Sequence, residues 1–194
     1  SVKWVNRVNG VASFAWLFLG IGIGLGSVWA YVMLGWGGYW GWDPVENASL
    51  LSWLACVALM HSFTLYRTHG TFKRWSVVCA CFAFMFVIVG TFISRSGIVQ
   101  SVHAFAGDSV SLVLFVALIV VALVAAVFGM FDRRKSFGVK TRREEGGSFF
   151  SKEMGYFLNT LIMMVGTFVL AYMTIASALP AWLPLGGQSL TSGT

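Results

Sequence analysis

The sequence predicts an all-α fold, a polytopic bundle of about five transmembrane helices with its N-terminus in the cytoplasm. Three observations predict it: few charged residues, five long apolar stretches, and an uneven distribution of lysine and arginine. Of the 194 residues, 58% are hydrophobic and 10% are charged, against about 45–50% and 25% in soluble proteins. A chain of this size that is so apolar is expected to lie in a lipid bilayer.

Five stretches are long enough to cross a membrane, because a helix needs about 20 apolar residues to span the hydrocarbon core. They are residues 11–34, 48–66, 75–93, 109–131 and 156–179, and we expect them to form one membrane domain over residues 1–194. The first contains four glycines at alternate positions from 20 to 26, which favour close helix packing. Three cysteines lie inside these stretches and are expected to be buried free thiols.

Lysine and arginine set the expected orientation. With the N-terminus in the cytoplasm, twelve of the 13 basic residues lie on the cytoplasmic side and only Arg95 lies outside. Loops 35–47 and 94–108 and the tail after residue 179 are then external, and the polar segment 132–155 is a cytoplasmic connector. This topology accounts for the net charge of +6, so lipid and not nucleic acid is the expected partner.

The first external loop is unusually aromatic. Between residues 36 and 42 it holds Trp36, Tyr39, Trp40 and Trp42, separated by glycines. Tryptophan and tyrosine collect at membrane interfaces, and such an interfacial belt is one interpretation. A belt needs no interleaved glycines, however, whereas glycines let a backbone turn sharply or approach a ligand. The pattern therefore favours an aromatic shelf suited to a planar apolar macrocycle.

The end of this loop carries a helix-start signature. Asp43 is a favourable N-cap, Pro44 fits the first helical position, and Glu46 stands where a capping box needs it. These residues therefore have a structural task without any chemistry. A second role for Asp43 or Glu46 in orienting a ligand is left open.

Two histidines and one arginine are further candidates. His103 lies in the second external loop, on the side of the aromatic loop, and neutral imidazole is a common axial ligand of haem iron; the alternative is a solvated side chain. Arg95 either pairs with a haem propionate or extends to the interface. His61 lies at membrane depth, where ionisable residues are functional candidates. It could bind a b-type haem, relay protons or make a buried hydrogen bond.

These segments resemble a known family. The string WGGYWGWDPVENAS (residues 36–49) is similar to the tryptophan-rich "WWD" signature of the haem-handling superfamily. Three further strings resemble the CcmF type, the cytochrome c haem lyase subunit: ALMHS (58–62), RSG with SVHAFA (95–97 and 101–106), and FSKE with LN (150–153 and 158–159). Tyr39 and Gly41 depart from the family, where many members carry further large aromatics.

The resemblance implies a function, a cofactor and partners. The family receives haem b from a CcmE-type haem chaperone and joins its vinyl groups to the cysteine thiols of apocytochrome c, helped by a thiol-reducing CcmH-type partner. Trp36, Trp40 and Trp42 match the floor of the haem site, and His103 matches the second of two external axial ligands. His61 matches one of two ligands of a resident b-type haem.

The resemblance also implies a place in the cell. The family's other external ligand and the other ligand of its resident haem have no match in this sequence. Their absence indicates a central piece of a longer protein, or one product of a split gene. The expected location is a bacterial inner membrane with the active face periplasmic, and the alternative is the mitochondrial inner membrane. A haem-delivery subunit without ligation activity is the rival function, and a structural subunit whose tryptophans form only a belt is a third hypothesis.

Overall fold

The computed structural model describes residues 2–35, 37–70, 72–99, 101, 103, 107, 109–137 and 151–188. Every regular element in these ranges is helical. The helices are α1 (Val2–Trp29), the π-helix η1 (Ala30–Leu34), α2 (Pro44–His69), α3 (Lys73–Ser96), α4 (Ser109–Asp132), the 3-10 helix η2 (Arg134–Phe137), α5 (Lys152–Ile175) and the 3-10 helix η3 (Ala176–Ala178). The predicted all-α class is therefore confirmed.

Five of these helices are long and apolar enough to cross a membrane, as the sequence predicts. Each predicted stretch lies largely within one of them, although the helices extend further. The largest difference is at α1, which begins at Val2, nine residues before the predicted start. Hydropathy indicates only the apolar part of a helix, so it missed this more polar first part. Here Val5 packs into the core, with 3% of its surface exposed.

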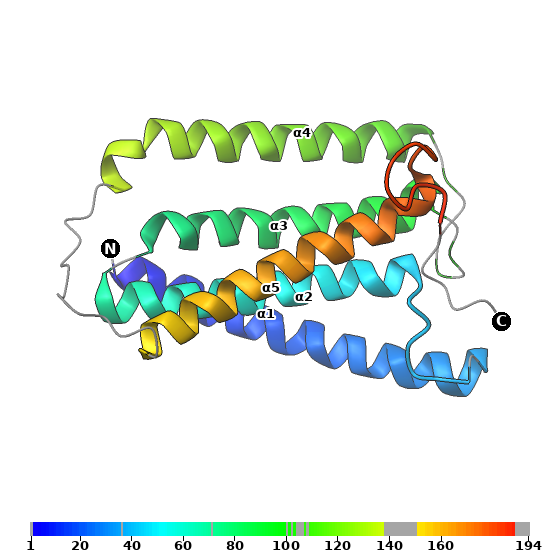
Figure 1. The fold of residues 1–194 in the computed structure, drawn as a ribbon, viewed down its shortest axis with the longest axis horizontal. Coiled ribbons are helices and arrows are strands. Elements are labelled where there is room, and N and C mark those ends of the chain that lie inside the picture. The colour runs from blue at the N-terminus through cyan, green and yellow to red at the C-terminus, as the bar shows by residue number, and fades with distance from the viewer. Residues whose placement is uncertain are drawn as a thin grey trace.

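The second long helix is the centre of the bundle. Helix α2 contacts α1, α3 and α5, whereas the main neighbour of α4 is α3 alone. Figure 1 shows α4 at one edge, separated from α1 by the other helices. Half of the most apolar window of α2 is buried and none of that of α4 is. Helix α2 therefore forms the buried centre of the bundle, and α4 faces outward.

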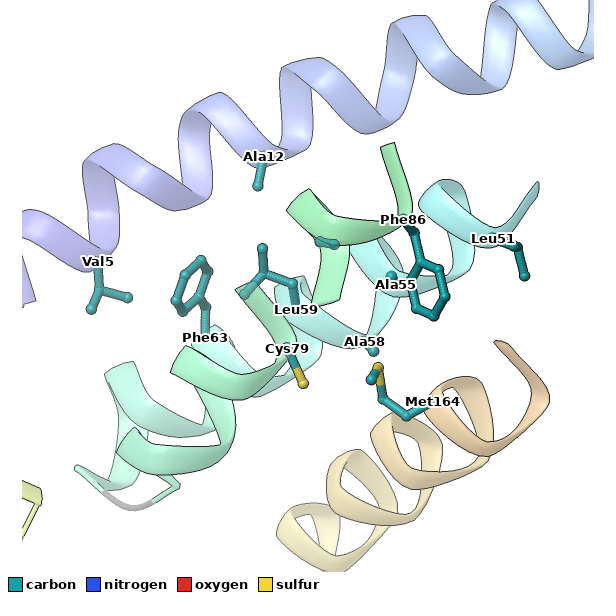
Figure 2. Packing of buried hydrophobic residues seen from close by; sticks show 11 residues of the cluster. Val5, Ala12, Leu51, Ala55, Ala58, Leu59, Phe63, Cys79, Phe86 and Met164 are labelled. Atoms are coloured by element: carbon teal, nitrogen blue, oxygen red, sulfur yellow. The ribbon is translucent and has the colours of Figure 1, made fainter. Parts of the chain in front are cut away.

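The core lies along α2 and uses residues of alternating size. Buried Leu51, Ala55, Ala58, Leu59 and Phe63 follow the helical period on its inner face. They meet side chains of α1, α3 and α5 (Figure 2), which are Val5, Ala12, Cys79, Ala83, Phe86 and Met164. In lipid, close contact between helices stabilises a bundle through packing and polar contacts more than through removal of water. The small alanines therefore suit this position.

Polar contacts and free thiols complete the core. The buried hydroxyl of Ser76 on α3 donates to the carbonyl of Ser62 on α2 at 3.1 Å, which is the kind of interhelical bond that membrane bundles use. Cys56, Cys79 and Cys81 are all free thiols, as expected, but only Cys79 is buried; Cys56 and Cys81 are half-buried.

The connections bring two loops to one end of the bundle. The link between α1 and α2 and the link between α3 and α4 lie at the same end, together with the end of α5, whereas the N-terminus lies at the other (Figure 1). We call this end the site end. The link from α1 to α2, residues 35–43, is called the Trp loop, and the link from α3 to α4, residues 97–108, the His loop. Most of the predicted connector 132–155 lies outside the described residues.

Candidate functional site

The Trp loop ends in a backbone conformation that is rare for a large side chain. Trp42 has a φ of 56°, a left-handed value that costs a non-glycine residue roughly 1–3 kcal/mol. The amide of Asn47, which is fully buried, donates to the Trp42 carbonyl at 2.9 Å and holds the turn. Trp40 and Trp42 then meet edge to face, with ring centroids 6.4 Å apart and planes at 85°. The two indoles therefore point in different directions and do not form one flat surface.

The first turn of α2 fixes the loop from below. The Glu46 carboxylate accepts from the backbone N–H of Gly41 at 3.0 Å and from that of Asp43 at 3.3 Å. The Asp43 side chain caps the helix by accepting from the Val45 N–H at 3.1 Å. The predicted capping box is thus confirmed, and it ties the aromatic loop rigidly to the helix.

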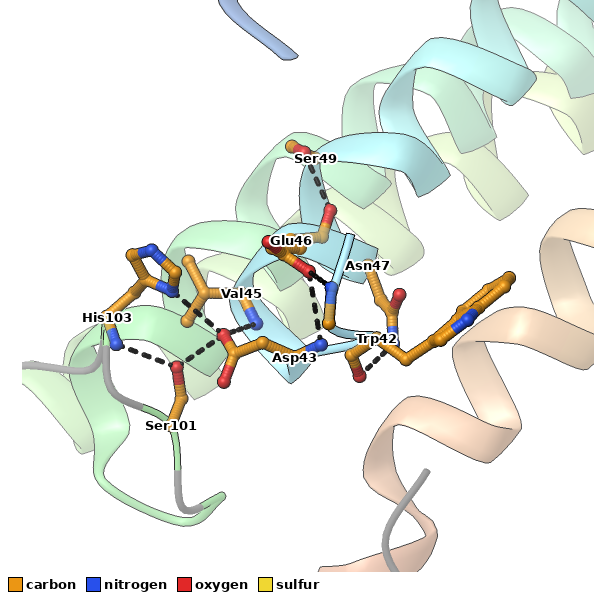
Figure 3. Close-up of polar contacts among 9 residues, drawn as sticks. Trp42, Asp43, Val45, Glu46, Asn47, Ser49, Ser101 and His103 are labelled. Atoms are coloured by element: carbon orange, nitrogen blue, oxygen red, sulfur yellow. Dashed lines mark hydrogen bonds and ion pairs between the residues drawn. The ribbon is translucent and has the colours of Figure 1, made fainter. Parts of the chain in front are cut away.

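The Asp43 carboxylate also reaches across to the His loop (Figure 3). Its Oδ2 accepts from the Ser101 hydroxyl at 2.6 Å and lies 3.2 Å from Nδ1 of His103. Ser101 Oγ in turn accepts from the backbone N–H of His103 at 3.0 Å. Residues about 60 positions apart thus form one polar cluster, in which the side chains of Asp43 and His103 are 6% and 24% exposed.

This contact favours one tautomer of the His103 ring. An ionised carboxylate has no proton to give, so Nδ1 must be the donor. In the neutral ring, Nε2 then carries the lone pair, which is the electron pair that a metal ligand needs. The ring also contacts Trp29, at the end of α1, with centroids 5.9 Å apart and planes tilted by 51°.

A cavity of about 360 Å³ lies between α1 and the start of α2, beside His103. Most of its lining is apolar. The lining residues are Phe18, Leu19, Gly22, Ile23, Gly26, Ser27, Trp29, Trp40, Val45, Glu46, Ser49 and His103. A Cβ added at Gly22 or Gly26 would meet nothing within 4 Å, so these glycines leave the α1 wall bare. Of the glycine series, only Gly20 lies close to another helix: a Cβ added there would lie 3.0 Å from Trp53 Nε1.

The structure gathers some predicted residues and separates others. Trp40 and His103 line the cavity, and Asp43 lies behind His103. Trp42 is 48% exposed, and Arg95 is exposed at the end of α3; neither lines the cavity. Trp36 lies outside the described residues.

Sequence reasoning missed Trp29 and the two cavity glycines. Trp29 lies near the end of an apolar stretch, where a tryptophan is usually an interface residue. Gly22 and Gly26 looked like packing positions. The one signal that links these residues is their spacing of three or four positions, which places them on one face of a helix.

His61 belongs to a different part of the molecule. It lies 18 residues after Asp43 on a continuous helix, about 27 Å along the axis. Its Nδ1 lies 2.9 Å from the carbonyl of Val57, one turn earlier. Its ring meets Tyr156 of α5 at a centroid distance of 5.8 Å. The fold therefore keeps the two candidate histidines apart.

The cavity residues fit a haem. An imidazole nitrogen is an established axial ligand, the walls are apolar and aromatic, and two glycines leave room along α1. Trp40 Nε1 is buried and has no hydrogen-bond partner among the described residues, so a lining residue of the cavity keeps an unsatisfied donor. The fold and this site define a multi-pass helical membrane protein with an indole and imidazole pocket at one end.

The chain belongs to the cytochrome c assembly protein family, whose profile matches residues 3–100. It is 40% identical over 176 residues to cytochrome c-type biogenesis protein CcmF of Haemophilus influenzae, covering 91% of this chain and 26% of that protein. It is 39% identical to CcmF of Escherichia coli, covering 91% and 27%. It is also 40% identical to CycK of Bradyrhizobium diazoefficiens, covering 89% and 26%.

The resemblance to the CcmF type is therefore confirmed, and the family supports a role in cytochrome c maturation. The chain spans about a quarter of the length of these relatives. No solved structure matches it.

Proposed function

We propose that this chain forms the haem-binding part of a membrane protein that attaches haem to apocytochrome c. The observation that carries the proposal is the His103 ring, which lines an apolar cavity while Asp43 holds its Nδ1. A histidine so arranged offers Nε2 to an iron beside the cavity. The family membership supports the same process.

Each residue around the cavity has a separate task. His103 is the axial ligand, and Trp40 and Trp29 provide aromatic walls for the porphyrin. The bare face at Gly22 and Gly26 admits the edge of the macrocycle. Trp36 and Trp42 are proposed to contact haem from the rim, and Arg95 to pair with a propionate from the end of α3. Because Trp29 stands at the end of α1 and Asp43 holds His103, these groups hold the substrate in one orientation.

Haem b is a substrate here, and the chain positions it. A cysteine of apocytochrome c adds across each vinyl group, so that sulfur bonds to the inner vinyl carbon and the thiol hydrogen ends on the outer carbon. No net oxidation occurs in this addition. The chain supplies binding and orientation, while haem and thiol supply the reactivity.

The surroundings follow from the same proposal. The site end faces the periplasm of a bacterial inner membrane. The opposite end, where most of the lysines and arginines lie in the predicted topology, faces the cytoplasm. A CcmE-type chaperone brings haem to this end, and a CcmH-type partner keeps the apocytochrome thiols reduced. His61 is proposed to bind a second, resident b-type haem, because its Nδ1 bond to Val57 also leaves Nε2 for a metal.

The first test compares His103→Ala and Trp40→Ala in the full-length protein, purified in detergent from cells that make haem. Both variants should lose most of the haem bound at the site end, and cells that carry them should lose most of their covalent cytochrome c. Trp182→Ala is the matched control, because Trp182 is 80% exposed and lines no cavity described above. Normal haem content and normal maturation in His103→Ala would refute the proposal.

A delivery subunit without ligation activity would use the same pocket. Thioether formation in a reconstituted system distinguishes the two functions. Wild-type protein with haem, reduced apocytochrome and reductant should yield covalent cytochrome, and His103→Ala should not. Transfer of haem without any thioether would favour the delivery function.

A further inference from the structure

We infer that Asp43 is a positioning residue for His103: its carboxylate selects the ring tautomer and couples the His loop to the first turn of α2. The inference rests on the proposed function, because Asp43 acts on haem only through the axial ligand. It also separates Asp43 from the residues that touch haem, since its side chain is 6% exposed and the cavity lining does not include it.

The number of bonds at one oxygen argues for this role. A helix cap needs one acceptor, and the Val45 N–H satisfies that need at 3.1 Å. Oδ2 nevertheless also accepts a hydrogen bond from the Ser101 hydroxyl at 2.6 Å and lies 3.2 Å from Nδ1 of His103. Serine or asparagine would cap a helix as well as aspartate. Only aspartate combines the cap with a charged acceptor that reaches the imidazole.

The helix start does not depend on these extra bonds. The capping box needs only the bond from the Val45 N–H to the Asp43 side chain and the bond from the Asp43 N–H to Glu46. The link to the His loop is therefore additional to local folding. It resembles the carboxylate partner that metal-ligating histidines commonly have, which fixes ring orientation and raises the basicity of the ligand.

The coupling has two physical consequences. The ring is held with Nε2 as its ligating nitrogen, so haem affinity rises. The negative charge at Nδ1–H also makes the imidazole a stronger electron donor, which favours ferric over ferrous iron. Loss of the charge should therefore raise the reduction potential of the bound haem, even where the haem remains.

Three variants of the full-length protein separate capping from positioning. Asp43→Ser keeps a capping hydroxyl but is too short to hold the His loop. Asp43→Asn keeps the size and the cap but removes the charge. Ser151→Ala is the matched control, because Ser151 caps α5 through the Met154 N–H at 3.2 Å, in a different part of the chain.

We expect Asp43→Ser to weaken haem binding about 10–100-fold, the usual cost of losing such a partner. Asp43→Asn should weaken it less and shift the haem reduction potential upward. Ser151→Ala should change neither quantity. In haem-free protein labelled with ¹⁵N-histidine, the His103 signal should show a protonated Nδ1 in the wild type and a mixture of tautomers in Asp43→Ser.

If both Asp43 variants kept the wild-type haem affinity, reduction potential and His103 tautomer, Asp43 would act only as a helix cap. That result would overturn the inference. Haem that stays bound to His103→Ala would refute the proposed function instead. The ¹⁵N measurement would still decide the link between Asp43 and His103, because it needs no haem.

Discussion

The two candidate histidines are held in opposite ways. His61 is oriented within its own helix, by the carbonyl of Val57 four residues earlier. His103 is oriented across the fold, by a carboxylate 60 residues away and by Ser101 of its own loop. Both arrangements place the proton on Nδ1, because carbonyl and carboxylate oxygens only accept. The geometry of His61 is therefore a local property of α2, whereas that of His103 exists only once two loops have met.

The strongest test of this comparison removes each ring in turn. His103→Ala should remove nearly all haem from the site end and leave a haem at His61 unchanged, because His61 lies about 27 Å along α2 from Asp43, the partner of His103. His61→Ala should do the reverse. Difference absorption spectra of the two purified variants, compared with the double variant, measure this. If either single variant lost both spectral components, the two sites would not be independent.

The next test fills the cavity from the α1 side. Gly26→Leu should lower haem affinity at the site end by at least about tenfold, because a side chain would occupy space that the macrocycle needs. Gly24→Leu is a close control: a Cβ at either glycine meets nothing within 4 Å, and Gly24 does not line the cavity.

Haem titration of both variants in detergent gives the two affinities. Equal affinities would show that haem does not lie against this face of α1. Haem at His61 should be unaffected by either change, since His61 does not line this cavity.

The same division between local and distant contacts explains what the sequence can predict. Five helices follow from apolar length, and the start of α2 follows from Asp43, Pro44 and Glu46, because each signal lies within one turn or one span. The contact of Asp43 with His103 and the place of Trp29 depend on how separate helices meet. A single sequence carries no local signal for that register.

The aromatic shelf illustrates the limit. Three tryptophans close in sequence suggest one flat surface, but the left-handed backbone at Trp42 turns neighbouring indoles to 85°. Side-chain direction in an irregular loop depends on each φ and ψ angle, which residue type alone does not determine. Among the described residues, the indole in ring contact with His103 is Trp29, from a different helix.

A smaller effect is expected at the aromatic neighbour of His61. Tyr156→Ala removes a ring from α5 that lies 5.8 Å from the imidazole. Aromatic pairs contribute about 0.5–1.5 kcal/mol, so haem affinity at His61 should fall about 2–13-fold and affinity at the site end should not change. Tyr156→Phe keeps the ring and should stay close to wild type. A large effect of Tyr156→Phe would indicate that the hydroxyl, and not the ring, matters.

The last test compares the supports of the two histidines directly. Val57→Ala leaves the backbone carbonyl that holds His61, so haem affinity there should change less than about twofold. Ser101→Ala removes the hydroxyl that joins Asp43 to the His103 backbone. Because such a bond contributes about 0.5–1.5 kcal/mol, affinity at the site end should fall about 2–13-fold. Equal and negligible effects in both titrations would show that the His loop is held without Ser101, and that His103 depends on distant side chains less than its geometry indicates.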